Sequence, residues 1–187
     1  MKKIILIFFL LVLTLGYAQK IPTFALRSEV GSYTQFGLRA LDKNDLYVIL
    51  GTSDPMTGSP PQYLVYIFKA KGDVYFYYKN SPLSSNKVEL SEEDKKRLFE
   101  TIHSKKFKKF LNYNQEDFEL KNKKKDYPLL LDTTYSLTVI QNGKQNTYSY
   151  FSKKHLESDN PRINKRMLKK YTDILDKFGE VKTDKGH

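Results

Sequence analysis

The sequence predicts an α+β protein in which hairpins form an antiparallel sheet and two helices pack on one face of that sheet. Three observations support this fold class: an Asn142-Gly143 turn between alternating runs, an aromatic stretch at 63–80 interrupted by Lys71-Gly72-Asp73, and amphipathic stretches at 91–111 and 161–178. Glycine-centred turns between apolar runs are typical of hairpins. Apolar residues at three- and four-residue steps are typical of helices that cover a sheet.

The first 18 residues have the layout of a secretory signal peptide. Two lysines precede an apolar run at 4–15, and Gly16-Tyr17-Ala18 offers small residues at a cleavage site. The run is shorter than the roughly 20 residues that a membrane-spanning helix needs, so we expect cleavage after Ala18 rather than an uncleaved anchor. The remaining 169 residues (187 minus 18) are then expected to form one exported domain at 19–187, periplasmic or secreted, with no transmembrane span.

Composition excludes several chemistries and favours one kind of partner. The chain has no cysteine, which excludes disulfides, thiol catalysis and cysteine-based zinc sites. Its formal net charge is +11, and its basic residues are 27 lysines and only 5 arginines. Arginine reads phosphates and bases with a two-pronged fork, whereas lysine is a flexible point charge. The excess therefore indicates solubility or a diffuse electrostatic preference more than sequence readout. The partner we expect, if there is one, is a protein or a glycan, either of which could be acidic, and not a nucleic acid.

The N-terminal half is expected to consist of strands. Alternation predicts strands at 23–30 and 33–41, joined by a turn at Gly31-Ser32. The continuous apolar run LYVIL at 46–50 is typical of a strand that is buried on both faces. A loop rich in proline and glycine is expected at 52–61.

The aromatic stretch at 63–80 is expected to be a hairpin whose two faces differ. A two-residue turn at 71–72 or 72–73 pairs residues whose numbers add to 143 or 145. Either pairing gives one face with Leu64, Tyr66, Phe68, Tyr75, Tyr77 and Lys79, and another with Tyr63, Val65, Ile67, Val74, Phe76 and Tyr78. A three-residue turn would mix the two sets.

One face of this hairpin is the candidate ligand-binding surface. The face that carries valine, isoleucine and phenylalanine is expected to belong to the core. Tyrosine is common on surfaces that bind proteins and carbohydrates, so the other face supplies the candidate ligand-binding residues Tyr66, Phe68, Tyr75 and Tyr77. The alternative is that a layer of N-terminal strand or loop covers these tyrosines and makes them structural.

The hairpin is expected to lead into a capped helix. A short edge strand is expected at 87–90, and Ser91 is followed by three acids that suit the positive end of a helix dipole. The apolar stripe of this helix extends to Leu111. A polar, irregular connection is expected at 112–127.

A second hairpin and a last helix complete the expected fold. Strands at 133–140 and 144–151 flank Asn142-Gly143, and the turn pairs residues whose numbers add to 285. One face of this hairpin is then apolar and the other carries Ser, Thr and Gln. Asn160-Pro161 is expected to begin the last helix, which Gly179 ends.

The histidines suggest no metal or cofactor site. His103 lies at the lysine-rich end of a helix, where a cation suits the dipole. His155, Glu157 and Asp159 alternate, as metal ligands on an extended segment would. A solvated loop that leads into a helix explains the same three residues, so we expect no metal and no cofactor.

Two acids could in principle serve a hydrolase. Asp54 lies in the long loop and Asp132 lies at the start of a strand, and paired carboxylates can cleave sugar polymers. Each acid is also a common turn residue, and nothing in the sequence brings them together. We therefore expect no catalytic residue.

The segment KKFKKF at 105–110 interleaves phenylalanine with lysine. This pattern occurs at membrane surfaces and in polyanion-binding segments. It also fits a solvated basic face whose phenylalanines complete the apolar stripe of the helix. If the segment binds a ligand, the export signal favours an anionic glycan, a lipid headgroup or an acidic protein.

The leading hypothesis is an exported, non-enzymatic binding or envelope-associated protein, and the alternative is a hydrolase of extracellular or envelope polymers. The order of its turns and caps resembles that of small exported bacterial domains of unknown function, over Leu46 to Phe178. The matching points are Pro61-Gln-Tyr63, Gly72-Asp-Val74, Asp132-Thr-Thr134 and Asn142-Gly143-Lys144. The resemblance implies no activity, cofactor or catalytic residue.

Overall fold

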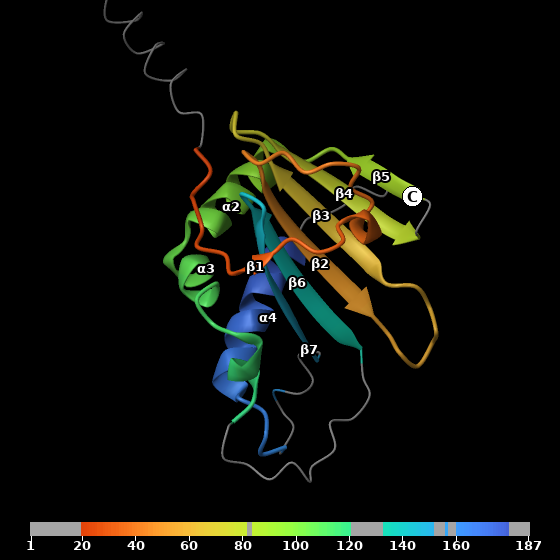
Figure 1. Ribbon diagram of the computed structural model, residues 1–187, viewed down its shortest axis with the longest axis vertical. Helices are drawn as coiled ribbons and strands as arrows, with labels where there is room; N and C mark the ends of the chain where they lie inside the picture. The colour runs from red at the N-terminus through yellow and green to blue at the C-terminus, as the bar shows by residue number, and fades with distance from the viewer. Residues whose placement is uncertain (1–19, 82–83, 121–132, 152–155, 157–159, 180–187) are drawn as a thin grey trace, which may run out of the picture.

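The computed structural model of the chain describes residues 20–81, 84–120, 133–151, 156 and 160–179. Seven strands form one antiparallel sheet in the order β1-β7-β6-β2-β3-β4-β5, and α2, α3 and α4 lie on one face of it (Figure 1). The strands are β1 Ser28–Glu29, β2 Leu46–Ser53, β3 Gln62–Phe68, β4 Val74–Ser81, β5 Ser84–Val88, β6 Thr134–Gln141 and β7 Lys144–Phe151. The helices are α2 Glu92–His103, α3 Lys105–Phe110 and α4 Lys165–Gly179, with short 3-10 turns η1 Thr34–Phe36 and η2 Gln115–Phe118. The predicted α+β fold is confirmed.

The hairpin of β6 and β7 forms as its turn sequence predicts. Asn142 and Gly143 both have positive φ, 54° and 72°, which is the backbone of a type I′ turn. The register pairs Gln141 with Lys144 and continues along both strands as predicted. The apolar face of this hairpin is buried beneath the helices and consists of Leu137, Val139, Tyr148 and Tyr150.

The hairpin of β3 and β4 has a three-residue turn, where the sequence predicts two. The Lys69 N–H donates to the Asp73 carbonyl at 2.7 Å, and the Gly72 N–H donates to the Lys69 carbonyl at 2.9 Å. Gly72 has a φ of 90°, because a three-residue hairpin loop ends in a left-handed residue that glycine adopts without strain. The extra residue shifts the register by one.

This shift contradicts the predicted sorting of side chains on the aromatic hairpin. Tyr66 pairs with Phe76 and Phe68 pairs with Val74. These four side chains face the helices and belong to one core. The opposite face instead combines residues that the sequence assigned to different faces, Val65, Ile67, Tyr75 and Tyr77.

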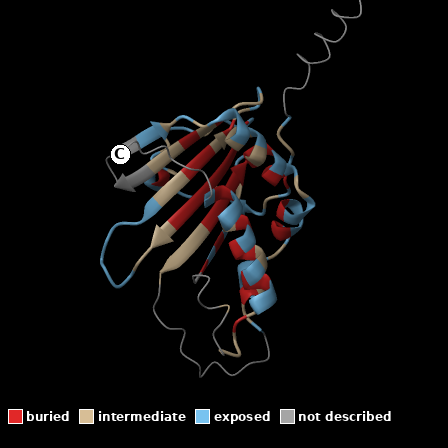
Figure 2. Ribbon diagram, turned by 180° about the vertical axis from the view of Figure 1, so that it is seen from behind, coloured by how far each residue is buried: buried red, intermediate tan, exposed pale blue. Residues whose placement is uncertain are grey.

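The sheet is covered on both faces. Seen from behind, Figure 2 shows buried residues along the central strands where the helices lie against them. The other face carries a second core of Phe36, Tyr47, Ile49, Val65 and Ile140, over which the 30–41 segment passes. Within it, the Phe36 ring meets the Tyr63 ring edge-on, with the centroids 5.1 Å apart. The strands predicted at 23–30 and 33–41 are therefore wrong apart from β1, because this segment packs its apolar side chains onto the sheet instead of extending it.

The first predicted helix is broken into α2 and α3. The break is at Ser104, whose backbone is extended with φ −63° and ψ 144°. Its side-chain oxygen accepts a hydrogen bond from the Phe107 N–H at 3.1 Å. Serine thus ends one helix and caps the next, which favours a bend over a continuous helix.

The last helix begins at Lys165, four residues after the predicted start at Pro161. Its cap is Asn164, whose side-chain oxygen accepts a hydrogen bond from the Met167 N–H at 3.2 Å. The Asn164 amide also donates to the Asp117 carbonyl at 2.8 Å. This second contact ties the start of α4 to η2, so the helix boundary depends on a tertiary partner.

Candidate functional site

The four residues expected to form a ligand-binding surface do not share a surface. Tyr66 and Phe68 are fully buried beneath the helices, and Tyr75 and Tyr77 are half-buried on the opposite face of the sheet. The Lys87 amine lies 4.7 Å from the centroid of the Tyr75 ring. A one-residue change in the turn separates the set, because it moves every side chain of one strand to the other face relative to its partner.

The acids and histidines named from the sequence form no cluster in the described part of the chain. Asp54 makes a local turn, in which its Oδ1 accepts from the Met56 N–H at 2.9 Å. His103 is exposed in the last turn of α2. The remaining candidates lie outside the described residues: Asp132, His155, Glu157 and Asp159.

In the described part of the chain, no three His, Asp or Glu side chains form a group that could hold a metal ion. None of the described helices is both long enough and apolar enough to cross a membrane.

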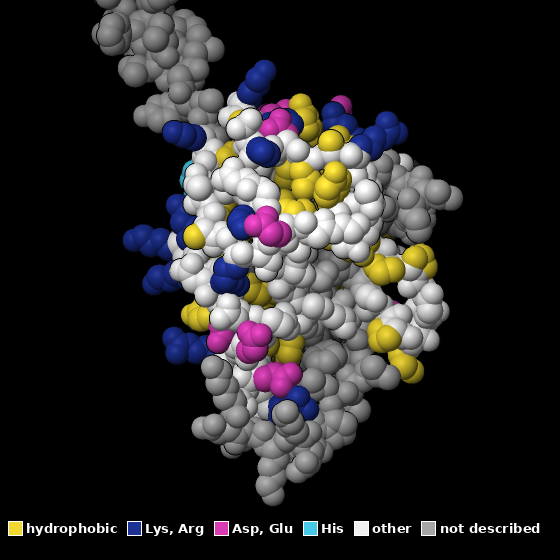
Figure 3. All heavy atoms as spheres, in the orientation of Figure 1, with side chains coloured by type: hydrophobic (Ala, Val, Ile, Leu, Met, Phe, Trp, Pro, Cys, Tyr) yellow, Lys and Arg dark blue, Asp and Glu magenta, His cyan; other side chains and the backbone are white. Residues whose placement is uncertain are grey.

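Helix α3 separates its lysines from its phenylalanines. Phe107 and Phe110 point inward and are each 1% exposed, and the Phe107 ring meets the Phe24 ring edge-on at 5.5 Å. All four lysines of the helix are exposed. Figure 3 shows lysine and arginine side chains gathered along the edge of the molecule that α2 and α3 form. The phenylalanines therefore complete the apolar stripe, and neither ring is available to enter a membrane.

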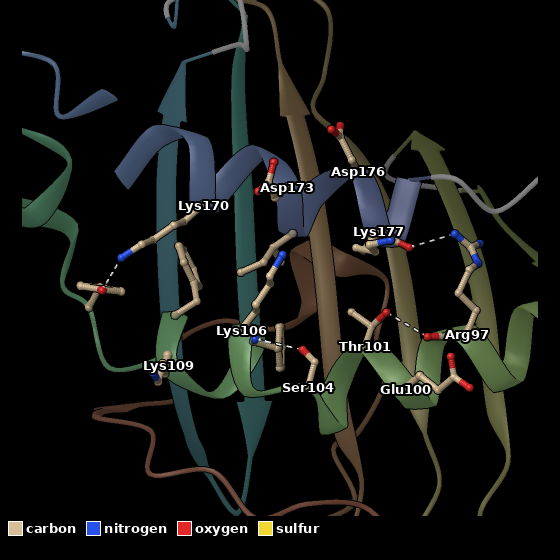
Figure 4. Close-up of a pocket in the computed structure, with 14 residues that line it drawn as sticks. Arg97, Glu100, Thr101, Ser104, Lys106, Lys109, Lys170, Asp173, Asp176 and Lys177 are labelled. Carbon is tan, nitrogen blue, oxygen red and sulfur yellow. Dashed lines mark hydrogen bonds between the residues drawn. The ribbon is translucent and has the colours of Figure 1, made fainter. Parts of the chain in front are cut away.

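A groove of about 620 Å³ lies between α2 and α3 on one side and α4 on the other (Figure 4). This volume is in the usual range for small-molecule sites. Apolar side chains in its lining are Phe107, Phe110 and Ile174. Its basic side chains are Arg97, Lys106, Lys109, Lys170 and Lys177, and its acids are Glu100, Asp173 and Asp176. Cations thus outnumber acids in the groove.

Two of these cations already have partners. The Arg97 guanidinium pairs with Asp94 at 2.9 Å and donates to the Lys177 carbonyl at 3.2 Å. The Lys170 amine donates to the Tyr113 hydroxyl at 2.5 Å. That hydrogen bond lowers the pKa of Tyr113, because a nearby ammonium stabilises the phenolate. Arg97 therefore braces α2 against α4, and Lys170 closes one end of the groove.

The lysines of α3 differ from these two. None of their four amines forms a hydrogen bond or an ion pair with any residue in the described part of the chain. Lys106 and Lys109 line the groove, whereas Lys105 and Lys108 do not. Figure 4 shows Lys106 extending from α3 toward α4. The groove therefore contains ammonium groups that are available to a ligand.

The end of α3 is fixed by the N-terminal segment. The Arg27 guanidinium donates to the carbonyls of Leu111 at 3.1 Å and Tyr113 at 2.6 Å. The Leu111 carbonyl also accepts from the Asn146 amide of β7 at 2.9 Å, and Asn146 in turn accepts from the Arg27 N–H. The last carbonyls of a helix lack partners within it, so these donors stabilise the helix end and hold one wall of the groove in place.

Comparison with known proteins adds no relative. No protein-family model matches the chain, and no curated protein matches its sequence significantly. The resemblance to small exported bacterial domains thus remains a prediction from turn and cap motifs.

Sequence reasoning identified one wall of the groove and missed the other. The sequence predicts KKFKKF as a possible basic site, and this segment forms the wall whose lysines have no ion-pair partner among the described residues. The opposite wall comes from α4, where Lys170, Ile174 and Lys177 recur at four- and three-residue steps. Any amphipathic helix has that spacing, so the sequence alone could not show that these residues face α3.

Proposed function

We propose that the protein is an exported, non-enzymatic binding protein that holds an anionic ligand in the groove between α3 and α4. One observation carries this proposal: the lysines of α3 are exposed and have no ion-pair partner among the described residues. Helix α3 has no acidic residue of its own. A ligand that brings carboxylate, sulfate or phosphate groups would supply the missing partners.

The position of the lysines strengthens this reasoning. Lys105 and Lys106 occupy the first turn of α3, where the helix dipole disfavours a positive charge. Four like charges on six residues also repel one another. Lys108 and Lys109 lie in the last turn, where the dipole favours a positive charge, so the cost that an anionic ligand would relieve is the mutual repulsion of the four charges.

Export is proposed from the N-terminal sequence, with its charged start, apolar run and small residues before Gln19. Phe24, shortly after the expected cleavage point, packs against Phe107 of α3, so the chain that follows this point belongs to the fold. Intact-mass analysis of protein recovered from the cell envelope or medium tests this part. A mass that retains Met1 would contradict cleavage after Ala18.

The binding proposal is tested by two matched double variants of α3. Lys106→Gln/Lys109→Gln removes the amines that line the groove, and Lys105→Gln/Lys108→Gln removes the same charge from the same helix outside it. Glutamine is nearly as good a helix former as lysine. Binding of two anionic probes, poly-L-glutamate and hyaluronan oligosaccharides, is measured by calorimetry, with neutral dextran as the blank.

We expect the groove variant to bind at least one anionic probe about three- to tenfold more weakly, since each exposed ion pair contributes roughly 0.2–1 kcal/mol. The outer variant, Lys105→Gln/Lys108→Gln, should change the logarithm of the dissociation constant by less than half as much. Added salt should weaken binding in every case. Equal losses in both variants would show that diffuse charge attracts the probe and that the groove has no special role.

A further inference from the structure

We infer that the ligand of this groove is an acidic oligosaccharide, a chain with widely spaced carboxylates and many hydroxyl groups. The inference rests on the proposed function, because it takes the groove as the binding site. It is carried by the groove's mixed charge, by the nature of its walls and by the state of its apolar lining.

The groove contains acids as well as free lysines. Glu100 of α2 and Asp173 of α4 both line it, and neither forms a hydrogen bond or an ion pair with a described residue. A chain with a charge on every unit would place some of its anions beside these carboxylates, which like-charge repulsion disfavours. A sugar hydroxyl can instead donate to a carboxylate in a charge-assisted hydrogen bond. The groove thus has lysines that can bind carboxylates and acids that can bind hydroxyl groups, and a sugar acid carries both kinds of group.

The walls of the groove suit a ligand that is recognised mainly through side chains. They come from α2, α3 and α4, with Ser104 and Tyr113 beside α3, and within a helix most backbone N–H and C=O groups bond to one another. An extended peptide gains affinity mainly from backbone hydrogen bonds to a sheet edge, and no such edge lines this groove. An oligosaccharide has no such requirement, since its hydroxyls bond equally well to side chains.

A helical peptide is disfavoured for a different reason. Such a peptide lays an apolar stripe into an apolar groove. Here Phe107 and Phe110 are each 1% exposed and Ile174 is 5% exposed, because these side chains are already packed into the core. The groove therefore offers little of the aromatic and branched side-chain surface against which such a stripe packs.

Phosphate-rich ligands fit the charge of the groove less well. Arg97 is the only arginine in the lining, and its guanidinium is engaged by Asp94 and the Lys177 carbonyl, so the two-pronged contact that suits phosphate and carboxylate alike is not available there. The lysines accept either anion as point charges. A phosphate carries more negative charge than a carboxylate, so Glu100 and Asp173 repel it more strongly.

The test asks whether removing the acids of the groove weakens or tightens the binding of two different anionic probes. Glu100→Gln/Asp173→Asn replaces both free acids of the groove with amides. Glu89→Gln/Glu116→Gln makes the same charge change at two exposed acids outside the groove. Binding is measured to a hyaluronan hexasaccharide, which has one carboxylate per disaccharide, and to poly-L-glutamate of similar length, which has one carboxylate per residue.

The groove variant is expected to bind the hexasaccharide about three- to tenfold more weakly, as the loss of hydroxyl-to-carboxylate hydrogen bonds implies. The same variant should bind poly-L-glutamate more tightly, because two repelling charges are gone. The outer variant should tighten both probes slightly.

Tighter binding of both probes by the groove variant would overturn the glycan inference and leave the anionic groove in place. So would wild-type protein that binds poly-L-glutamate as tightly as the hexasaccharide. If Lys106→Gln/Lys109→Gln and Lys105→Gln/Lys108→Gln weaken probe binding equally, the proposed function itself is overturned. Failure of the glycan inference and failure of the proposed function are therefore distinguishable.

Discussion

Tyr66 offers the sharpest test of the observed register. Its side chain is fully buried, and its ring stacks on Phe76 with centroids 4.7 Å apart and interplanar angle 18°. Its hydroxyl donates to the Phe178 carbonyl at 2.5 Å. That carbonyl lies in the last turn of α4, where helix carbonyls lack intrahelical partners. Tyr66 therefore both fills the core and caps the helix that covers it.

These contacts set the expected losses. Tyr66→Ala removes a buried aromatic ring and should reduce the free energy of unfolding by about 3–5 kcal/mol, as large-to-small core changes do. Tyr66→Phe keeps the ring and leaves the Phe178 carbonyl without its donor, which should reduce it by about 1–3 kcal/mol. Phe76→Ala should resemble Tyr66→Ala, because both rings lie in one stack. Tyr77→Ala, on the other face and half-buried, should reduce it by about 1 kcal/mol.

Urea unfolding of the four variants, followed by circular dichroism and tyrosine fluorescence, measures these losses. Coincident transitions from both probes establish two-state behaviour before the values are compared. If Tyr77→Ala and Tyr66→Ala destabilise the protein equally, the register argued here is wrong. A loss below about 1 kcal/mol for Tyr66→Ala would likewise contradict its burial.

Three further perturbations test other parts of the fold. Gly51→Ala would place a Cβ 3.0 Å from the Tyr63 ring and against the Ser136 hydroxyl, and should reduce the free energy of unfolding by about 1–3 kcal/mol; adding Ser136→Ala should restore part of it in a double-mutant cycle. Arg27→Ala should reduce the free energy of unfolding by about 1.5–3 kcal/mol, and Arg27→Lys should recover only a fraction in the same urea assay, because lysine lacks the planar fork that directs separate N–H groups to the Leu111 and Tyr113 carbonyls. Burial raises the pKa of Tyr150 to about 12 and also raises that of two fully buried tyrosines, Tyr66 and Tyr171. The unfolded chain releases these protons near pH 10 and the folded chain retains them, so the contribution of these three tyrosines to stability should be constant below that pH and fall as pH rises above it. Other tyrosines, such as Tyr113 with its lowered pKa, ionise in the folded chain; the result that would contradict this is tyrosinate absorbance from every tyrosine of the protein before it unfolds.

The second hairpin shows what local sequence can determine. A two-residue type I′ turn needs positive φ at both of its residues, and Asn142-Gly143 is the pair that adopts it most readily. The turn length fixes the register, and the register fixes which side chains face the helices. Every step depends on neighbours in sequence, so the prediction succeeds.

The first hairpin shows where this reasoning fails. Lys71-Gly72-Asp73 is compatible with two-residue and three-residue loops, which differ little in local energy. Both faces of the strands are apolar, so the hydrophobic pattern cannot choose the register either. The choice depends on the two layers that cover the sheet, the helices and the 30–41 segment, and neither can be placed from the sequence of the hairpin.

The candidate site combines both situations. The lysines of α3 are visible as KKFKKF, and the sequence predicts that they form one face of a helix. The groove exists only because α4, some sixty residues further along, packs beside α3. Arg97, which joins α2 to the end of α4, and Arg27, which holds the end of α3, are polar contacts over 80 or more residues. No periodic pattern encodes such contacts.

The double covering of the sheet also bears on where function lies. Tyrosines on an open sheet face would suggest a binding platform, but here both faces of the aromatic hairpin pack against other segments of the chain. The hairpin tyrosines have structural partners: the Tyr66 hydroxyl bonds to the Phe178 carbonyl, and the Lys87 amine lies over the Tyr75 ring at 4.7 Å. The lysines of α3 have no such partners in the described chain, and two of them sit where the helix dipole opposes their charge. For this reason we place the proposed ligand in the basic groove and not on the aromatic sheet.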